Sequence, residues 1–267
     1  MDLLRNQRSG SFLEIGGNDG ISTTNTFHLE ACLGWQGILV EGHPENYKRM
    51  LRTRPGVLGL GMAVCKEHGF IGFTNRSGVA SGINELMTSS HRKRFRIAEN
   101  NVMPVPCGPL GDWMSVLKAT SIDFFVSAHS IRTAALVDQR YEATARRSPP
   151  RVEQSLDVEG AEMLVLQTLD WNVLTLGVLL IECTSSGGQG CKSKQDEAIG
   201  TYLSDRGLTR LGAFRARHDI WDLVFVNESR LAELDTGWNH VPWEGANSSA
   251  LLKRGRVDER YERNRGD

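Results

Sequence analysis

The opening residues of this 267-residue chain carry the pattern that most restricts its fold, a strand, a glycine turn, a helix and a second strand. Residues 11–15 (SFLEI) form a short apolar run that ends at the turn 16–20 (GGNDG). Residues 37–41 (GILVE) form a second apolar run that ends on an acid. Two such strands joined by a helix lie parallel in one sheet, so we expect an α/β fold.

The same alternation continues along the chain. Strands with helices between them predict a doubly wound, mostly parallel sheet with helices on both faces. The polar, glycine-interrupted stretch 75–102 is expected to be a mobile loop or lid. Further strands are predicted at 57–64, 69–74, 178–183 and 221–227, and helices at 44–54, 112–118, 160–169 and 196–206.

The glycine turn has the features of a nucleotide-binding loop. In a doubly wound sheet, ligands bind beyond the carboxyl ends of the strands, and glycines let the backbone approach them closely. Glu41 follows Gly20 by 21 residues, at the end of the second strand, where an acid accepts hydrogen bonds from ribose hydroxyls. The turn lacks the third glycine of the dinucleotide pattern G-x-G-x-x-G. Asn18 and Asp19 also make it acceptor-rich, which suits a positively charged sulfonium cofactor better than a pyrophosphate.

Three separated blocks of the sequence resemble one family. FLEIGGNDGISTTNTFHLEACLGWQGILVEGHPENY, then SLDVEGAEMLVLQTLDW and VLLIEC, resemble the FkbM-type S-adenosylmethionine-dependent methyltransferases. The resemblance implies a class I methyltransferase fold, a seven-stranded Rossmann-like sheet whose final antiparallel strand includes 221–227. It implies S-adenosyl-L-methionine as cofactor and O-methylation of a hydroxyl on a sugar, polyketide or similar small molecule. The implied cofactor contacts are Glu14, Gly16, Asn18, Asp19 and Gly20 in the loop, Glu41 at the ribose, Ala63 and Val64 near the adenine, and Asp157 facing the methyl donor.

A hydroxyl acceptor also needs a base within hydrogen-bond reach. Asp157 and Glu159 are the candidates, with His43 and then His91 behind them. Each has a structural alternative. Asp157 could bind the cofactor without acting as a base. Glu159 lies in the first turn of a predicted helix, where an acid interacts favourably with the helix dipole whatever the chemistry. His43 could simply cap the helix that follows it. His91 lies in the basic run 91–96 (HRKRFR), which is typical of a solvated surface. No cluster has metal-ligand spacing, so we expect no metal.

One predicted strand is cut in two. Residues 122–125 read as its first half and 155–158 as its second, and joining them restores the pattern of the family that the chain resembles. The piece between, 126–154, begins with Val-Ser, and the codons GTGAGC or GTGAGT for this pair match a splice-donor sequence. It ends with Gln, whose codon CAG matches the usual splice-acceptor sequence. We interpret it as a retained intron, and the alternative is a true surface insertion. The insert is expected to leave Asp157 less well positioned.

Composition limits the partners. The net charge of −1 gives no general reason to expect a nucleic acid, and no apolar stretch is long enough to span a membrane. We expect a small-molecule or glycan acceptor and, from the sequence as it stands, a cytoplasmic chain.

Five scattered cysteines favour reduced thiols, and the sequons at Asn75, Asn227 and Asn247 are interpreted as chance matches. The expected domains are an N-terminal extension (1–10), the methyltransferase domain (11–227) and a polar, disordered tail (228–267).

Two other functions stay open. The insert at 126–154 allows a catalytically silent, cofactor-binding protein or a misannotated isoform. A related sheet could also serve an NAD(P)-dependent oxidoreductase, although the missing glycine makes this the weaker alternative.

Overall fold

The computed structural model describes residues 9–22, 24–78, 80–87, 89–127, 161–183, 191–215 and 221–229. Three regions named above fall wholly or largely outside these ranges. They are the N-terminal extension, the insert with the half-strand that follows it, and the polar tail.

Seven strands form the main sheet, in the order β3-β2-β1-β7-β8-β10-β9. β10 pairs antiparallel with both β8 and β9, whereas the strands from β3 to β8 pair parallel. This confirms the predicted doubly wound, mostly parallel sheet with an antiparallel strand near its end. The strands are β1 (Ser11–Ile15), β2 (Gln36–Val40), β3 (Leu58–Leu60), β7 (Ser121–Ser127), β8 (Thr175–Glu182), β9 (Thr209–Arg215) and β10 (Trp221–Val226).

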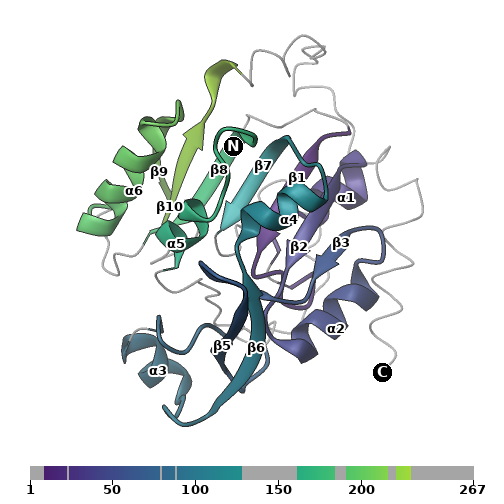
Figure 1. Ribbon diagram of the computed structural model, residues 1–267, viewed down its shortest axis with the longest axis vertical. Helices are drawn as coiled ribbons and strands as arrows, with labels where there is room; N and C mark the ends of the chain where they lie inside the picture. Colours follow the sequence, from purple (N-terminus) through teal and green to yellow (C-terminus); the bar gives the residue numbers. More distant parts are fainter. Residues whose placement is uncertain are drawn as a thin grey trace, which may run out of the picture.

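Helices cover both faces of this sheet (Figure 1). One face packs against α1 (Phe27–Leu33) and α2 (Pro44–Thr53), which contribute Leu29 and Met50 to a core with Phe12, Leu39 and Phe124. The opposite face packs against α4, α5 and α6 around a larger core that contains Leu13, Phe125 and Ile181. These three helices are α4 (Leu110–Val116), α5 (Glu162–Gln167) and α6 (Lys194–Ser204).

The helix ends follow local sequence signals. α1 ends at Gly34, whose φ of 72° suits a residue without a Cβ. Pro44 occupies the first turn of α2, and the ring of His43 accepts a hydrogen bond from the Glu45 backbone N–H, so His43 caps this helix. At α6, Ser193 and Asp196 form a reciprocal capping box.

A second, three-stranded sheet lies beside the main one, in the order β4-β6-β5 (Figure 1). It consists of β4 (Ala63–Val64), β5 (Gly69–Thr74) and β6 (Val102–Gly108), with α3 (Ser89–Phe95) in the connection from β5 to β6. The single strand expected at 57–64 is therefore wrong, because the run divides between β3 of the main sheet and β4 of the small one. The stretch 75–102, expected to be a mobile loop or lid, contains the helix α3.

The sequence pattern missed two strands. β6 carries Pro104 and Pro106, which argue against a strand because proline cannot donate a ladder hydrogen bond. In the structure both prolines pair only with β5, and β6 contacts β4 only at Cys107 and Gly108. β9 was missed because TRLGAFR has no long apolar run.

β7 continues past the point at which the sequence suggested a break. Val126 is fully buried and pairs with Glu14 of β1 and Leu180 of β8, and Ser127 pairs with Ile181. The first two residues of the suspected insert thus complete this strand, in place of Ser155 and Leu156.

Four of the five cysteines form disulfides, so the expectation of reduced thiols is wrong. Cys65 and Cys107 join β4 to β6 with a Cα–Cα distance of 5.6 Å. Cys183 and Cys191 have Cα atoms 5.1 Å apart and link the end of β8 to the residues before α6. Cys32 is the remaining free thiol. Sequence spacing did not reveal either pair, because each depends on which segments the fold brings together.

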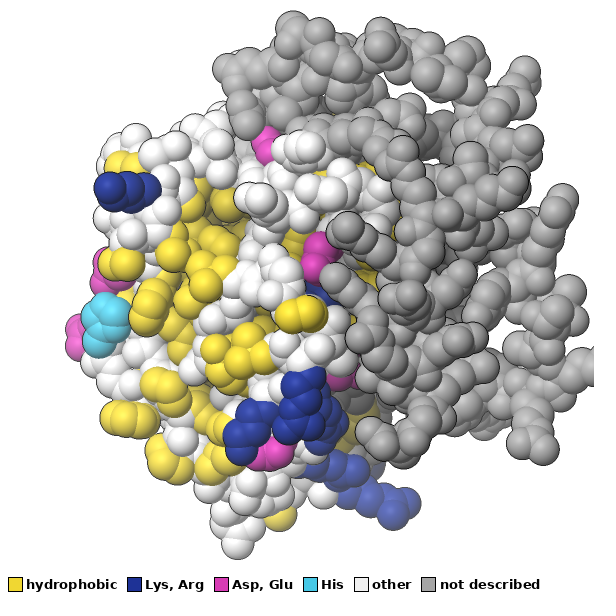
Figure 2. Space-filling model, turned by 90° about the vertical axis from the view of Figure 1, so that its right-hand side faces the viewer, with side chains coloured by type: hydrophobic (Ala, Val, Ile, Leu, Met, Phe, Trp, Pro, Cys, Tyr) yellow, Lys and Arg dark blue, Asp and Glu magenta, His cyan; other side chains and the backbone are white. Residues whose placement is uncertain are grey.

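The surface is mixed in character. On the face shown in Figure 2, apolar side chains form a broad area and basic side chains gather below it. The large hydrophobic residues exposed in the molecule include Leu51, Leu58 and Val116. Within the described ranges, no helix is long and apolar enough to cross a bilayer.

Candidate functional site

The glycine loop after β1 adopts a backbone that its sequence favours. Gly16, Asn18 and Gly20 have φ values of 83°, 45° and 81°, in the left-handed region open to glycine and tolerated by asparagine. The N–H groups of Gly16 and Gly17 both donate to the carbonyl of Val40, at 2.9 and 3.1 Å, which ties the loop to the end of β2. This end of the sheet also carries Glu41.

Glu41 is 2% exposed and is held by backbone donors. The N–H of Asn18 donates to its Oε2 at 2.8 Å, and the N–H of His43 donates to its Oε1 at 2.7 Å. Burial raises the pKa of Glu41 to about 7, and the hydrogen bonds from His43, Asn18 and the Asn46 side chain oppose that rise. Each carboxylate oxygen keeps lone pairs for a further donor.

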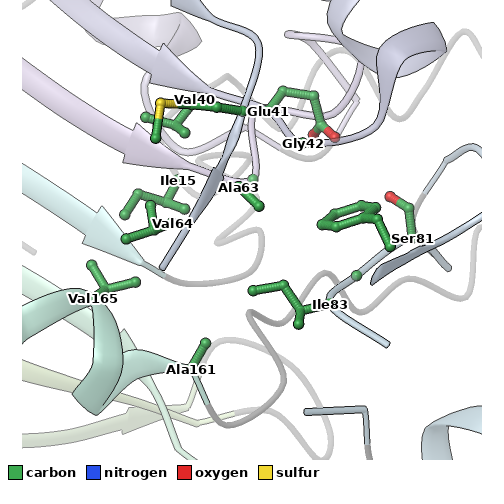
Figure 3. A pocket seen from close by; sticks show the side chains of 14 residues that line it. Ile15, Val40, Glu41, Gly42, Ala63, Val64, Ser81, Ile83, Ala161 and Val165 are labelled. Carbon is green, nitrogen blue, oxygen red and sulfur yellow. The ribbon is translucent and has the colours of Figure 1, made fainter. Parts of the chain in front are cut away.

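A pocket opens beside Glu41, at the carboxyl ends of β1 and β2 (Figure 3). The space between its walls, part of which is open to solvent, is about 590 Å³. These walls come from six short segments of the chain and are mostly apolar, with Glu41 and Ser81 as polar groups. The lining residues are Ile15, Gly16, Val40, Glu41, Gly42, Met62, Ala63, Val64, Phe73, Ser81, Gly82, Ile83, Ala161 and Val165.

Four of the residues expected to contact the cofactor line this pocket, namely Gly16, Glu41, Ala63 and Val64. The sequence did not single out the second wall, from Phe73, Ser81, Gly82 and Ile83. These residues belong to the small sheet and the loop after β5, which lack any local motif. Their place at the pocket depends on that sheet packing beside β1 and β2.

Glu14 lies behind the loop. Its Oε2 accepts hydrogen bonds from the hydroxyls of Thr24 and Thr26, both at 2.5 Å, and its Oε1 accepts one from the Asn25 N–H at 2.8 Å. The side chain is 1% exposed. Glu14 therefore holds the segment between the glycine loop and α1.

Arg54 supports the same segment from α2. It is fully buried, donates to the carbonyl of Gly20 at 3.1 Å and pairs with Glu30. Its guanidinium also lies 5.5 Å from the ring centroids of Phe12 and Phe27. No signal in a single sequence separates this arginine from the neighbouring basic residues of α2.

Asp19 and Gly20 shape the far side of the loop. Asp19 accepts hydrogen bonds from the N–H groups of Ile21 and Ser22, at 3.0 and 2.7 Å. A Cβ at Gly20 would lie 2.7 Å from atoms of Thr53 and Arg54, so this position packs tightly against α2.

Asn46 connects the two walls of the pocket. It is fully buried, and its side chain hydrogen-bonds to Glu41. The amide also donates to the Ser81 hydroxyl at 3.1 Å, and its oxygen accepts from the Gly78 N–H at 2.7 Å. One side chain thus joins the acid at the end of β2 to the loop that carries Ser81.

The candidate bases fall in different places. Asp157 and Glu159 lie outside the described residues. His43 is 4% exposed and caps α2 through Nδ1, and burial lowers its pKa below the ordinary value. His91 is also buried, with its ring centroid 4.6 Å from that of Phe95, so the expected solvated position for it is wrong.

The sequence also missed a buried acid at the carboxyl end of β8. Asp222 of β10 lies opposite Glu182 of β8 in the antiparallel ladder. Asp222 is fully buried, and neither of its carboxylate oxygens has a hydrogen-bond partner among the described residues. Burial raises the pKa of Asp222 to about 8. Within the described part of the chain, no group of three or more His, Cys, Asp or Glu residues could hold a metal.

Comparisons with known proteins give structural similarities only. No protein-family model and no curated protein matches the sequence. Fibrillarin from Aeropyrum pernix, crystallised with natively bound S-adenosyl-L-methionine, is 11% identical with a TM-score of 0.40, over 82% of this chain and 67% of that one. A methyltransferase from Pyrococcus furiosus is 13% identical with a TM-score of 0.38, over 84% and 79%. A TehB-like SAM-dependent methyltransferase from Corynebacterium glutamicum is 11% identical with a TM-score of 0.37, over 82% and 80%. The fold assignment rests on the strand order of this chain.

Proposed function

We propose that this chain is an S-adenosylmethionine-dependent methyltransferase of the FkbM type, which methylates a hydroxyl on a sugar, polyketide or similar small molecule. The observation that supports it best is the pocket at the carboxyl ends of β1 and β2, with buried Glu41 on one side and apolar walls around it. A doubly wound sheet binds its ligand at such a place.

The residues present fit this cofactor. Glu41 would accept hydrogen bonds from the ribose hydroxyls, and Gly16 would let the backbone approach the ligand. Ala63, Val64 and Ile83 offer an apolar surface for the adenine. Glu14, Asn18, Asp19 and Gly20 are proposed to act through the shape of the loop. When bound, the sulfonium supplies a methyl group that an acceptor oxygen attacks in line, so alignment provides most of the acceleration.

The acceptor side is proposed to use Asp157 as its base, with Glu159 and His43 as further candidates. His43 is the weakest of the three, because its Nδ1 already accepts the hydrogen bond that caps α2. Glu182 lies at the carboxyl end of β8, and doubly wound sheets bind ligands beyond the carboxyl ends of their strands.

One observation favours a second candidate, a cofactor-binding chain without catalysis. Val126 and Ser127 occupy the places in β7 that residues 155 and 156 were expected to fill, and Asp157 lies outside the described residues. The pocket itself is built from β1, β2, the small sheet and α5. Such a chain would bind the cofactor and fail to transfer its methyl group.

Calorimetric titration of the full chain with S-adenosylhomocysteine, and separately with NAD, tests the proposal. We expect S-adenosylhomocysteine to bind and NAD not to bind. Gly16→Val should abolish binding because it fills space at the pocket. Gly207→Val is the matched control, because Gly207 has a similar φ of 79° and a Cβ there meets nothing within 4 Å. Unfolding temperatures of both variants check that they fold.

Two outcomes would contradict the cofactor assignment. Binding of NAD in place of S-adenosylhomocysteine would favour an oxidoreductase, and full affinity in a folded Gly16→Val variant would place the ligand elsewhere. Binding of S-adenosylhomocysteine without methyl transfer to any hydroxyl acceptor would favour the silent form.

A further inference from the structure

The two disulfides indicate the kind of cellular compartment in which this protein folds. Their Cα–Cα distances of 5.6 and 5.1 Å lie within the range of disulfides, so the backbone needs no movement to form either bond. Cys65 and Cys107 are 8% exposed and belong to the core of the small sheet, with Phe73 and Val105. Disulfides of this structural kind form and persist in oxidising compartments and are rare in the cytosol.

Reduced thiols are typical of a cytoplasmic chain, and that expectation is wrong for four of the five cysteines. The sequons therefore have to be considered again. An Asn-X-Ser/Thr sequence in a surface loop is a glycosylation acceptor in a protein that enters the secretory pathway. The chain has three, at Asn75, Asn227 and Asn247, and the last lies outside the described residues.

Asn75 has the position of an acceptor. It is exposed and follows the last residue of β5, in the sequence Asn75-Arg76-Ser77. Its backbone is fixed, because its N–H donates to the Asn101 carbonyl at 2.9 Å and its carbonyl accepts from the Asn101 side chain at 3.3 Å. No hydrogen bond engages its side-chain amide among the described residues. A glycan there would displace no buried group.

Asn227 has a different position. It is half-buried at the end of β10, its N–H donates to the carbonyl of Gly177 at 2.8 Å, and it makes a further interaction. A glycan on this residue would compete with the packing of the main sheet. The structure thus separates two sequons that look alike in the sequence.

We propose that Asn75 carries an N-linked glycan, attached in the oxidising compartment in which the two disulfides form. The donor is a lipid-pyrophosphate-linked oligosaccharide. The Asn75 amide nitrogen bonds to the anomeric carbon and loses a proton, while the bond from that carbon to the pyrophosphate oxygen breaks and the lipid pyrophosphate leaves. The proposal is independent of the methyltransferase assignment.

The test uses the full chain, tagged and expressed in its own source cells, and lysed in the presence of a thiol-alkylating reagent. Mass spectrometry with and without peptide N-glycosidase is expected to show a glycan on the Asn75 peptide. We expect Cys32 to be alkylated and the other four cysteines to be protected. Asn75→Gln and Ser77→Ala should remove the glycan, Ser77→Thr should keep it, and Asn227→Gln is the control that should not change it.

An unmodified Asn75 peptide in the wild-type chain would overturn the proposal. So would alkylation of all five cysteines, because that result would place the chain in a reducing compartment.

Discussion

The ionisation of Glu41 should control cofactor affinity. Its carboxylate is buried at the pocket, with one backbone donor on each oxygen, and burial raises its pKa from an ordinary 4.5 to about 7. Ribose hydroxyls would donate to this group, so the ligand binds best to the ionised form. In the free protein Glu41 gains a proton as the pH falls through about 7, and affinity should fall with it.

The size of the effect follows from linkage. Each pH unit below a free-protein pKa of about 7 reduces the ionised fraction about tenfold, which corresponds to about 1.4 kcal/mol of binding free energy. Above about pH 8 the affinity should level off, because the group is already ionised. Glu41→Gln should be independent of pH over this range. It should also bind more weakly than the wild type at high pH by about 1–3 kcal/mol, because an amide cannot replace both acceptors.

The assay is titration with S-adenosylhomocysteine between about pH 6 and pH 8. Glu45→Gln is the matched control, because Glu45 is an exposed acid in the first turn of α2, four residues after Glu41. We expect its profile to follow the wild type. A wild-type affinity that does not change with pH, or a folded Glu41→Gln variant with full affinity, would refute the reasoning.

Three further changes test other parts of the structure. Asn46→Ala should weaken S-adenosylhomocysteine binding and move its pH midpoint upward, because the lost hydrogen bond had lowered the pKa of Glu41; an unmoved midpoint in the same titration would contradict this. The raised pKa of Asp222 means that its contribution to stability is complete below about pH 4 and is lost as the pH rises towards about 8. Asp222→Asn should flatten that fall, which is at most about 1.4 kcal/mol per pH unit, and thermal unfolding at several pH values measures it. Deletion of 126–154 should keep S-adenosylhomocysteine binding, because no residue that lines the pocket lies in this segment; loss of binding in a folded variant would identify the segment as a genuine structural element.

The core of the fold could be predicted because its signals are local. SFLEI, the glycine turn and GILVE specify a strand, a left-handed turn and a second strand within thirty-one residues, and the structure places β1 at Ser11–Ile15 as expected. The place of Glu41 at the pocket could be predicted because it ends the second strand, and such sheets bind ligands beyond the carboxyl ends of their strands. The place of Gly16 could be predicted because it begins the glycine turn after the first strand.

The rest depends on contacts between distant segments. Nothing near Asn46 in the sequence shows that it reaches Ser81, and nothing near Cys65 shows that it pairs with Cys107. The small sheet could not be predicted, because the prolines of β6 argue against a strand in the sequence. In the structure these residues nevertheless pair with β5. Sequence patterns therefore predict single elements better than they predict the walls of a pocket.

The register of β7 connects the insert to the acids at the carboxyl end of the sheet. Val126 pairs with Leu180 and Ser127 with Ile181, so the next residue of a continuous strand would lie level with Glu182. If residue 125 were joined directly to 155, Ser155 and Leu156 would take the places of Val126 and Ser127, and Asp157 would take that next place. Because side chains alternate along a strand, Asp157 would share a face with Glu182 and with Asp222, which lies opposite it. Three neighbouring carboxyls repel one another when ionised, so at least one of them would hold its proton near neutral pH. A base on the acceptor side needs a pKa in that range, and the joined strand would provide it.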